Sequence, residues 1–148
     1  MNLKKIGRFI LFLLPWFISS IIFRSDTAYY QSLSKPFFAP ASWIFAIVWP
    51  ILYILLTYSI TNTIDDSNPK YKKNLIINYL SNQLFSFFFF TIKNNPLSLI
   101  DTIIVLISSI YVYKETKSIN NKYHYYIIPY LLWNIFATIL ILSITAMN

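Results

Sequence analysis

A chain of 148 residues that is 57% hydrophobic and only 11% charged is too apolar for a soluble domain, and its composition is typical of a membrane protein. It contains no cysteine and one histidine, which excludes disulfides, thiol chemistry and a metal site built from several histidines of one chain. The net charge of +7 does not indicate nucleic-acid binding, because the basic residues lie at the ends of apolar segments and form no single patch.

Five apolar segments approach the roughly 17–25 residues that a helix needs to cross a bilayer. They cover residues 6–23, 42–62, 75–92, 97–113 and 125–146. The sequence therefore predicts an all-α membrane protein, a single domain over residues 1–148 that forms a bundle of five transmembrane helices. The first segment is longer than the roughly 7–15 residues of a signal-peptide core, and no clear cleavage site follows it, so we expect it to be retained.

Lysine and arginine are distributed unequally between the loops. The N-terminus and the second and fourth loops hold nine of them, whereas the first and third loops hold three and the C-terminus none. Because positively charged loops stay in the cytoplasm, we expect a cytoplasmic N-terminus and an external C-terminus. The expected location is a bacterial cell membrane.

The first segment and the loop after it carry prolines. Pro15 lies near the centre of the segment and is expected to kink it, because proline removes one backbone hydrogen bond. The loop over residues 24–41 contains two X-Pro steps together with Phe37 and Phe38, apolar residues that a plain linker would not need. We interpret this loop as a structured lid. A proline-stiffened linker with an aromatic belt is the alternative.

The second segment carries a row of side chains on one face. Ser42 is a good N-cap residue, and Ala46, Trp49, Tyr53 and Thr57 follow at three- and four-residue steps, which places them on one side of a helix. This aromatic face predicts the wall of a pocket. The fifth segment has a comparable face, formed by Tyr130, Trp133, Ala137 and Ile141.

The third segment is the most polar one, with Asn78, Asn82 and Ser86 at steps of four residues. Amides without partners are costly in hydrocarbon, so this stripe must face protein, water or a ligand. Hydrogen bonding between helices would explain the stripe as well and is kept as an alternative. Asp101, near the start of the fourth segment, is expected to stabilise that helix start rather than to carry a proton.

Three regions match the motifs of one family. The first motif, K-P-x-[FW]-x-P-P-x-W-x-F-x-x-V-W-x-x-L-Y-x-x-M-G, is the most specific and is met by Lys35, Pro36, Phe38, Pro40, Trp43, Phe45, Val48, Trp49, Leu52 and Tyr53. The second region is met by Asn82, Ser86, Phe89, Phe90, Lys93, Asn94, Leu99 and Asp101, and the third by Pro129, Tyr130, Trp133, Phe136, Ala137, Thr138 and Leu140. On these residues the chain resembles the TspO/translocator-protein family, also called the tryptophan-rich sensory proteins or the peripheral-type benzodiazepine receptors.

The resemblance implies a five-helix bundle, expected to be a homodimer among membrane lipids, with a pocket between the helices that the first loop covers. Family members bind porphyrins such as protoporphyrin IX and haem, so the expected partner is a porphyrin-type small molecule, bound as a ligand and with no cofactor or metal. Residues carried over to the ligand site are Phe38, Trp43, Trp49, Tyr53, Asn82, Ser86, Trp133 and Ala137. From charge and depth, Arg24, Lys35 or Lys93 is expected to pair with the propionates.

The expected function is that of an integral membrane tetrapyrrole-binding protein with a sensory, stress-response or trafficking role. A light-dependent porphyrin-degrading enzyme is the first alternative. Some bacterial members degrade protoporphyrin in light with tryptophans that match Trp49 and Trp133, which makes these two the candidate catalytic pair. The chain departs from the family pattern at Ala41, Phe85 and Ile141, where the family has proline, tryptophan and asparagine. It also has Leu56 and Thr57 in place of Met-Gly, and Asn78 where the family usually has glutamine. A small-molecule transporter or helper protein is the second alternative.

Overall fold

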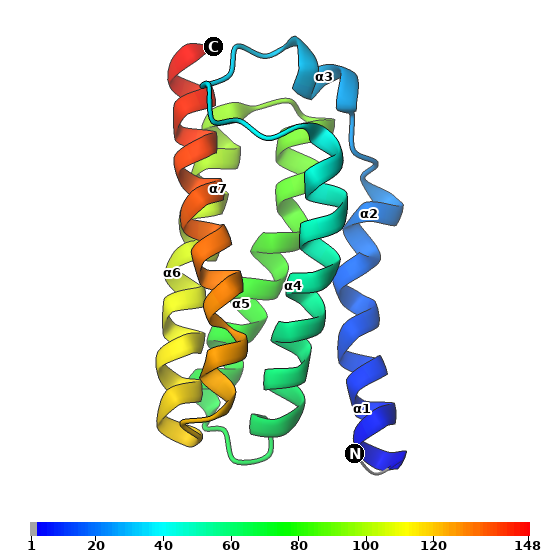
Figure 1. Cartoon of the computed structure of the whole chain (residues 1–148), viewed down its shortest axis with the longest axis vertical. Helices are drawn as coiled ribbons and strands as arrows, with labels where there is room; N and C mark the ends of the chain where they lie inside the picture. The colour runs from blue at the N-terminus through cyan, green and yellow to red at the C-terminus, as the bar shows by residue number, and fades with distance from the viewer. Residues whose placement is uncertain (1–2) are drawn as a thin grey trace.

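The computed structural model describes residues 3–148, and helices are the only regular elements over that range. In chain order these are α1 (Leu3–Leu13), the 3-10 turn η1 (Leu14–Phe17), α2 (Ile18–Ile22), α3 (Thr27–Ser32), α4 (Ser42–Thr63), α5 (Pro69–Ser86), the π turn η2 (Phe87–Thr91), α6 (Asn95–Ile119), the 3-10 turn η3 (Tyr123–Tyr126) and α7 (Ile128–Met147). The long helices run side by side, and α3 with its loop lies across the end that holds the C-terminus (Figure 1). The predicted all-α bundle with a structured first loop is confirmed.

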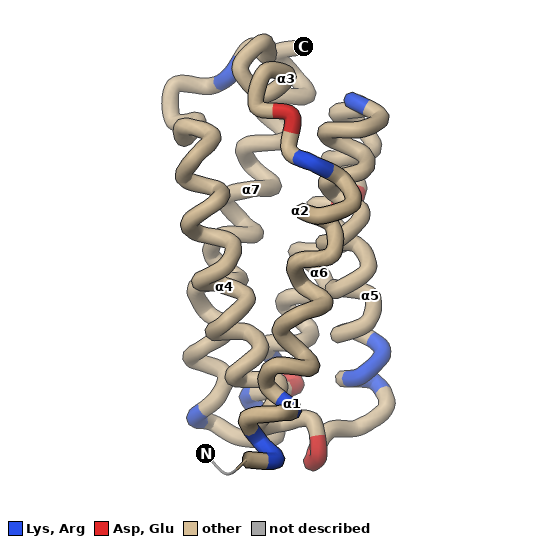
Figure 2. Tube along the Cα trace, turned by 90° about the vertical axis from the view of Figure 1, so that its right-hand side faces the viewer, with Lys and Arg blue, Asp and Glu red and all other residues tan. Residues whose placement is uncertain are grey.

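Four stretches of the described chain are long and apolar enough to cross a membrane: Leu3–Ile22, Ser42–Thr63, Asn95–Ile119 and Tyr123–Met147. The expected third span, residues 75–92, corresponds to most of α5 together with η2 and is not among these four stretches. By itself α5 carries three lysines near its start, and it buries Asn78, Asn82 and Gln83 inside the bundle. A fifth span therefore stays a prediction. Lysine and arginine gather at the two ends of the bundle, with little charge along its length (Figure 2).

The predicted kink at Pro15 is confirmed, since α1 gives way there to η1 before the helix resumes as α2. Two side chains of α5 bind the backbone at this break. Tyr79 Oη donates to the carbonyl of Pro15 at 2.9 Å, and Gln83 Nε2 donates to the carbonyl of Trp16 at 3.2 Å. The Ser19 N–H in turn donates to Gln83 Oε1 at 2.9 Å. The polar groups freed by the break are thus satisfied by a neighbouring helix, as membrane helices with interior prolines require.

Replacing Gln83 by leucine is expected to lower the free energy of unfolding by about 1–3 kcal/mol, because it leaves two backbone groups without partners inside the bundle. Unfolding of the detergent-solubilised protein, followed by tryptophan fluorescence, measures the change. Ser143→Ala is the matched control, because this exposed hydroxyl donates only to its own helix, at Ile139 O. A Gln83→Leu protein as stable as the control would contradict the repair of the kink by α5.

Two groups of apolar side chains form the core. The larger group joins α1, α4, α5, α6 and α7 toward the N-terminal end of the bundle and includes Trp16, Tyr53 and Tyr130. The smaller one lies beneath the first loop and comprises Tyr30, Phe89, Leu140, Ile141 and Ile144. Residues of both groups line the cavity described below, so the cavity lies where the two groups meet.

The first loop is folded against the bundle through contacts at several places. Asp26 caps α3 by accepting the N–H of Tyr29 at 2.9 Å, and its carboxylate also pairs with Lys93 at 2.9 Å, on the loop before α6. Farther along the loop, the backbone of Ser34 is bound by the side chain of Asn148. The Ser34 N–H donates to Asn148 Oδ1, and Asn148 Nδ2 donates to the Ser34 carbonyl, each at 2.9 Å. These contacts join the loop to the start of α6 and the end of α7.

The Asp26 ion pair makes the attachment of the loop sensitive to pH. The Tyr29 backbone N–H and the ammonium of Lys93 lower the pKa of Asp26 from its ordinary value of 3.8. Because the folded state favours the carboxylate, this stabilisation is complete above pH 3.8 and is lost as the pH falls through the lower folded-state pKa. At neutral pH, Asp26→Asn is expected to speed amide hydrogen exchange in α3. Asp65→Asn, which breaks the pair with Arg8 at the opposite end, serves as control and is expected to leave α3 unchanged.

Candidate functional site

The bundle contains a cavity of about 520 Å³ in the half that lies under the first loop. This volume falls within the roughly 300–1,000 Å³ of small-molecule sites. Its walls come from η1, α2, α3, α4, α5, η2, α6 and α7, so most of the helical elements contribute to it. The lining is largely apolar and aromatic, which is typical of a site for a flat apolar ligand.

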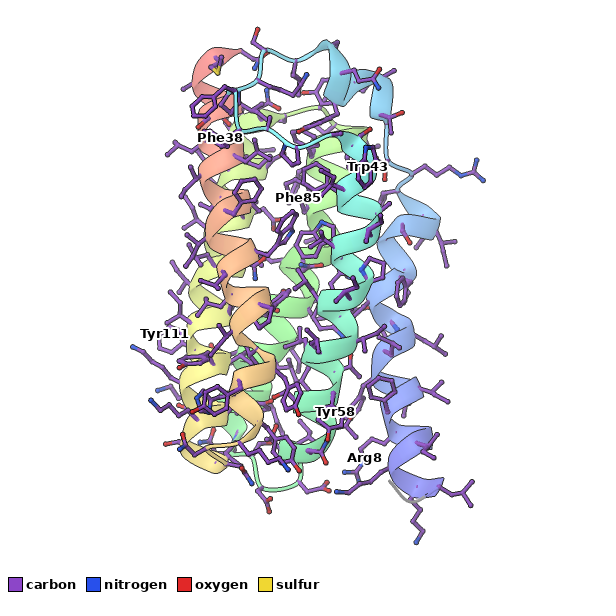
Figure 3. The ribbon with its side chains drawn as sticks, in the orientation of Figure 1. Arg8, Phe38, Trp43, Tyr58, Phe85 and Tyr111 are labelled. Atoms are coloured by element: carbon purple, nitrogen blue, oxygen red, sulfur yellow. The ribbon has the colours of Figure 1, made fainter. Side chains whose placement is uncertain are left out.

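Six of the eight residues expected to bind a ligand line this cavity: Trp43, Trp49, Tyr53, Asn82, Ser86 and Ala137. The remaining two, Phe38 and Trp133, do not. Figure 3 places Phe38 beside α7 under the loop, and its ring meets the edge of Phe136 with the ring centres 6.2 Å apart. In the same view Trp43 projects from the first turn of α4 on the side of α2. The ligand-binding roles of all eight remain predictions.

Stacked aromatic rings form the cavity wall on the α4 side. The Tyr53 ring stacks with Trp49 at a centre-to-centre distance of 5.5 Å and with Trp16 at 5.0 Å. On the α5 side, Phe85 and Phe89 stack at 5.3 Å and nearly in parallel, at 14°. Phe85 stands where the family has a tryptophan, and the cavity keeps an aromatic face at that position.

The polar stripe of α5 has two different roles. The Asn78 amide donates to the Val105 carbonyl at 3.0 Å and to the Ser109 hydroxyl at 2.9 Å, both on α6, so Asn78 fits the alternative of hydrogen bonding between helices. Asn82 lines the cavity and also holds its wall together. Its Oδ1 accepts from Tyr53 Oη at 2.7 Å, and its Nδ2 donates to Tyr130 Oη at 3.3 Å.

Trp49 and Trp133, the candidate catalytic pair, are in contact. Their ring centres are 6.4 Å apart and their planes are perpendicular. Only Trp49 lines the cavity, whereas Trp133 also packs against Phe45 and Phe136, at 5.9 and 5.1 Å. The Trp133 indole N–H is buried and has no hydrogen-bond partner among the described residues.

Two of the three cations expected to pair with ligand carboxylates are already bound. Lys35 Nζ donates to the carbonyls of Tyr30 and Leu33, both at 2.8 Å, and thereby closes the end of α3, and Lys93 pairs with Asp26. Arg24 has no ion-pair partner within residues 3–148. In the same range, no three His, Cys, Asp or Glu side chains come together to hold a metal ion.

Asp101 lies near the start of α6, as expected, but it does not cap the helix. The start of α6 is capped by Asn94, whose Oδ1 accepts the N–H of Leu97 at 2.9 Å. Asp101 lies in the second turn, only 3% exposed, and its Oδ2 has no hydrogen-bond partner among the described residues. It does not line the cavity, so we give it no part in ligand binding.

Sequence reasoning missed two residues that shape the site. Trp16 lines the cavity and stacks on Tyr53, and Gln83 holds the backbone next to it. The sequence carried a signal for Trp16, because an indole next to a proline in the centre of an apolar helix is placed where that helix bends. The sequence signal for Gln83 was weaker, because it is one more amide side chain in the polar α5.

Comparison with known proteins agrees with the motifs. A sequence model of the TspO/MBR family matches residues 9–147. The chain is 33% identical to an uncharacterized membrane protein, YtaB, of Bacillus subtilis, over 98% of both chains. It is 29% identical to the tryptophan-rich protein TspO of Bacillus cereus over 100% of both chains. It is 27% identical to the protein of the same name from Archaeoglobus fulgidus, over 100% of this chain and 99% of the relative.

Proposed function

This chain belongs to the TspO/MBR family, and we propose that it binds a tetrapyrrole of the protoporphyrin IX or haem kind inside the membrane. The observation that carries the proposal is the aromatic cavity of about 520 Å³, lined by Trp49 and Tyr53 on one wall and by Phe85 on another. A porphyrin is a flat, apolar ring with anionic groups at its rim. An aromatic lining on two walls suits the flat, apolar body of such a ligand.

The polar rim of the ligand needs a different surface, and the mouth of the cavity offers one. Hydroxyl groups of Ser20, Ser25 and Thr27 line it, and Arg24 lies next to Ser25 in the chain. Because Lys35 and Lys93 are engaged within the protein, Arg24 is the cation that we assign to a propionate. A guanidinium group suits this role, since it pairs with carboxylates through two parallel hydrogen bonds.

Titration of the purified protein with protoporphyrin IX in the dark tests the proposal. We expect saturable quenching of tryptophan fluorescence, because Trp16, Trp43 and Trp49 line the cavity. Arg24→Gln is expected to lower the affinity for protoporphyrin IX. Added salt is expected to lower the affinity of the parent protein in the same way, because salt screens the ion pair. Lys122→Gln, at the opposite end of the bundle, is the control and is expected to leave the affinity unchanged. Quenching that rises linearly with porphyrin and never saturates would reject the proposed ligand.

A second candidate function, porphyrin degradation in light, is favoured by the contact between Trp49 and Trp133. Indole rings in contact offer a route for an electron between the bound, light-excited ligand and the protein interior. Illumination of the same sample separates the two functions. Bound porphyrin that bleaches faster than free porphyrin in detergent, and that loses this difference in Trp49→Phe, would establish degradation. Equal bleaching rates of bound and free porphyrin would support binding without degradation.

The protein is an integral membrane protein, and its orientation is part of the proposal. We infer a cytoplasmic N-terminus from the excess of lysine and arginine at the end of the bundle that holds α1. The first loop and the cavity then lie in the external half of the membrane. Labelling of single cysteines introduced at Ser67 and at Ser34 with a membrane-impermeant reagent, from outside intact cells, tests this assignment. Reaction at Ser34→Cys alone is expected.

Chemical cross-linking in membranes tests the homodimer that the family resemblance implies.

A further inference from the structure

The cavity is exposed on one side only. Its exposed lining residues are Ser20, Ser25, Thr27, Trp43 and Ala46, which come from α2, the segment after it, α3 and the start of α4. The lining residues of α5, α6 and α7 are buried or half-buried. Trp43 is 63% exposed although it lines the cavity, so its ring stands at the boundary between the cavity and the surroundings. The cavity therefore opens sideways, between α2 and α4.

The kink at Pro15 explains why the two helices part at this place. Below the kink, α1 is joined to the end of α4 by the ion pair of Arg8 with Asp65. Above it, α2 is held by the other neighbour, because the Ser19 N–H donates to Gln83 and the Phe23 ring meets Phe87 at 5.1 Å. Figure 2 shows α4 and α2 diverging toward the end that carries α3. The break in the first helix turns it toward α5 and leaves the side between α2 and α4 open.

In contrast to the open side, the end of the cavity beneath the first loop is covered. The first loop lies across it and is attached on both sides, through Asp26 with Lys93 and through Ser34 with Asn148. The Tyr30 hydroxyl, which also borders the cavity, donates to the Pro40 carbonyl at 2.9 Å and ties the loop to itself. A ligand arriving from water would have to break these contacts. On the side, no hydrogen bond or ion pair between described residues joins α2 to α4.

We propose that the opening between α2 and α4 is a lateral portal, through which the ligand passes directly from the surrounding lipid into the cavity. This inference rests on the proposed function and adds to it the class of ligand, an amphipathic molecule dissolved in the external half of the bilayer. The hydroxyls at the portal match the polar edge of such a molecule, and the exposed indole of Trp43 suits the membrane interface. The first loop then acts as a fixed cover, and the ligand does not need it to open.

The absence of cysteine from the chain allows two engineered pairs to be compared directly. Ser20→Cys with Ala46→Cys, joined by a reducible bifunctional thiol reagent, closes the portal. Ser34→Cys with Asn148→Cys, joined in the same way, locks the loop. Protoporphyrin IX is mixed with proteoliposomes and its association rate is followed by tryptophan quenching. We expect the portal cross-link to slow association by about tenfold or more, with recovery on reduction, and the loop cross-link to leave it within about twofold.

The opposite pattern, or equal rates with both cross-links, would overturn the portal.

Absence of saturable binding in the parent protein would instead reject the proposed ligand. A second experiment, which uses no porphyrin, then tests the portal by itself. A single cysteine in the cavity, Ala137→Cys, is treated with a lipid-soluble maleimide or with a charged, membrane-impermeant one. Faster reaction with the lipid-soluble reagent, slowed by a second substitution Ser20→Trp, supports the portal. Faster reaction with the charged reagent refutes it.

Discussion

Replacing Trp49 by alanine is expected to raise the dissociation constant for protoporphyrin IX by roughly 5- to 150-fold, since stacking on one aromatic side chain is worth about 1–3 kcal/mol. The indole lines the cavity and stacks on Tyr53, so the substitution removes one face of the wall and loosens the ring beside it. Because the change also removes a fluorophore, binding is best followed through the visible absorbance of the porphyrin.

Two other variants make this result specific. Trp49→Phe keeps an aromatic ring and is expected to retain most of the affinity. Trp133→Ala removes an indole that does not line the cavity, and its effect is expected to be the smaller of the two alanine substitutions. If Trp49→Ala bound the porphyrin as tightly as the parent protein, the ligand would not lie in this cavity.

The largest loss of stability is expected at Asn78. Asn78→Leu removes the amide that donates to Val105, Ser108 and Ser109 and that accepts from Tyr130 Oη at 2.8 Å. Because these partners stay inside the bundle, the free energy of unfolding is expected to fall by about 2–4 kcal/mol.

Unfolding in a denaturing detergent, followed by circular dichroism, measures the effect. Asn78→Gln keeps a side-chain amide at this position and is expected to recover most of the stability. A leucine variant that unfolds together with the parent would mean that the Asn78 network contributes nothing net.

The positions on α4 could be predicted from the sequence because their spacing is local. Trp49 and Tyr53 follow one another by one helical turn, and a helix of that length fixes their common face. Trp133 could not be assigned in the same way. It shares a face with Ala137, yet its ring turns toward Phe45 and Phe136, and only the packing of α4 against α7 decides this.

The charged residues of the first loop show a second limit. Lys35 looked like a free cation at the membrane surface. It lies just beyond α3, however, where the last carbonyls of a helix have no partners within the helix and attract a positive charge. The ammonium group therefore binds the protein's own backbone. Since α3 has only six residues and no apolar periodicity, the sequence did not predict the helix that binds this lysine.

The polarity of α5 has a consequence for how the chain is inserted during synthesis. Because it carries Asn78, Asn82 and Gln83, an isolated α5 gains less from entering hydrocarbon than the four apolar stretches do. Most partners of Asn78 lie on α6, which is synthesised next and is apolar enough to span the bilayer. We therefore expect α5 to wait for α6 and to move into the lipid with it as a hairpin. Ribosome-bound chains that end before α6 would leave α5 accessible to water.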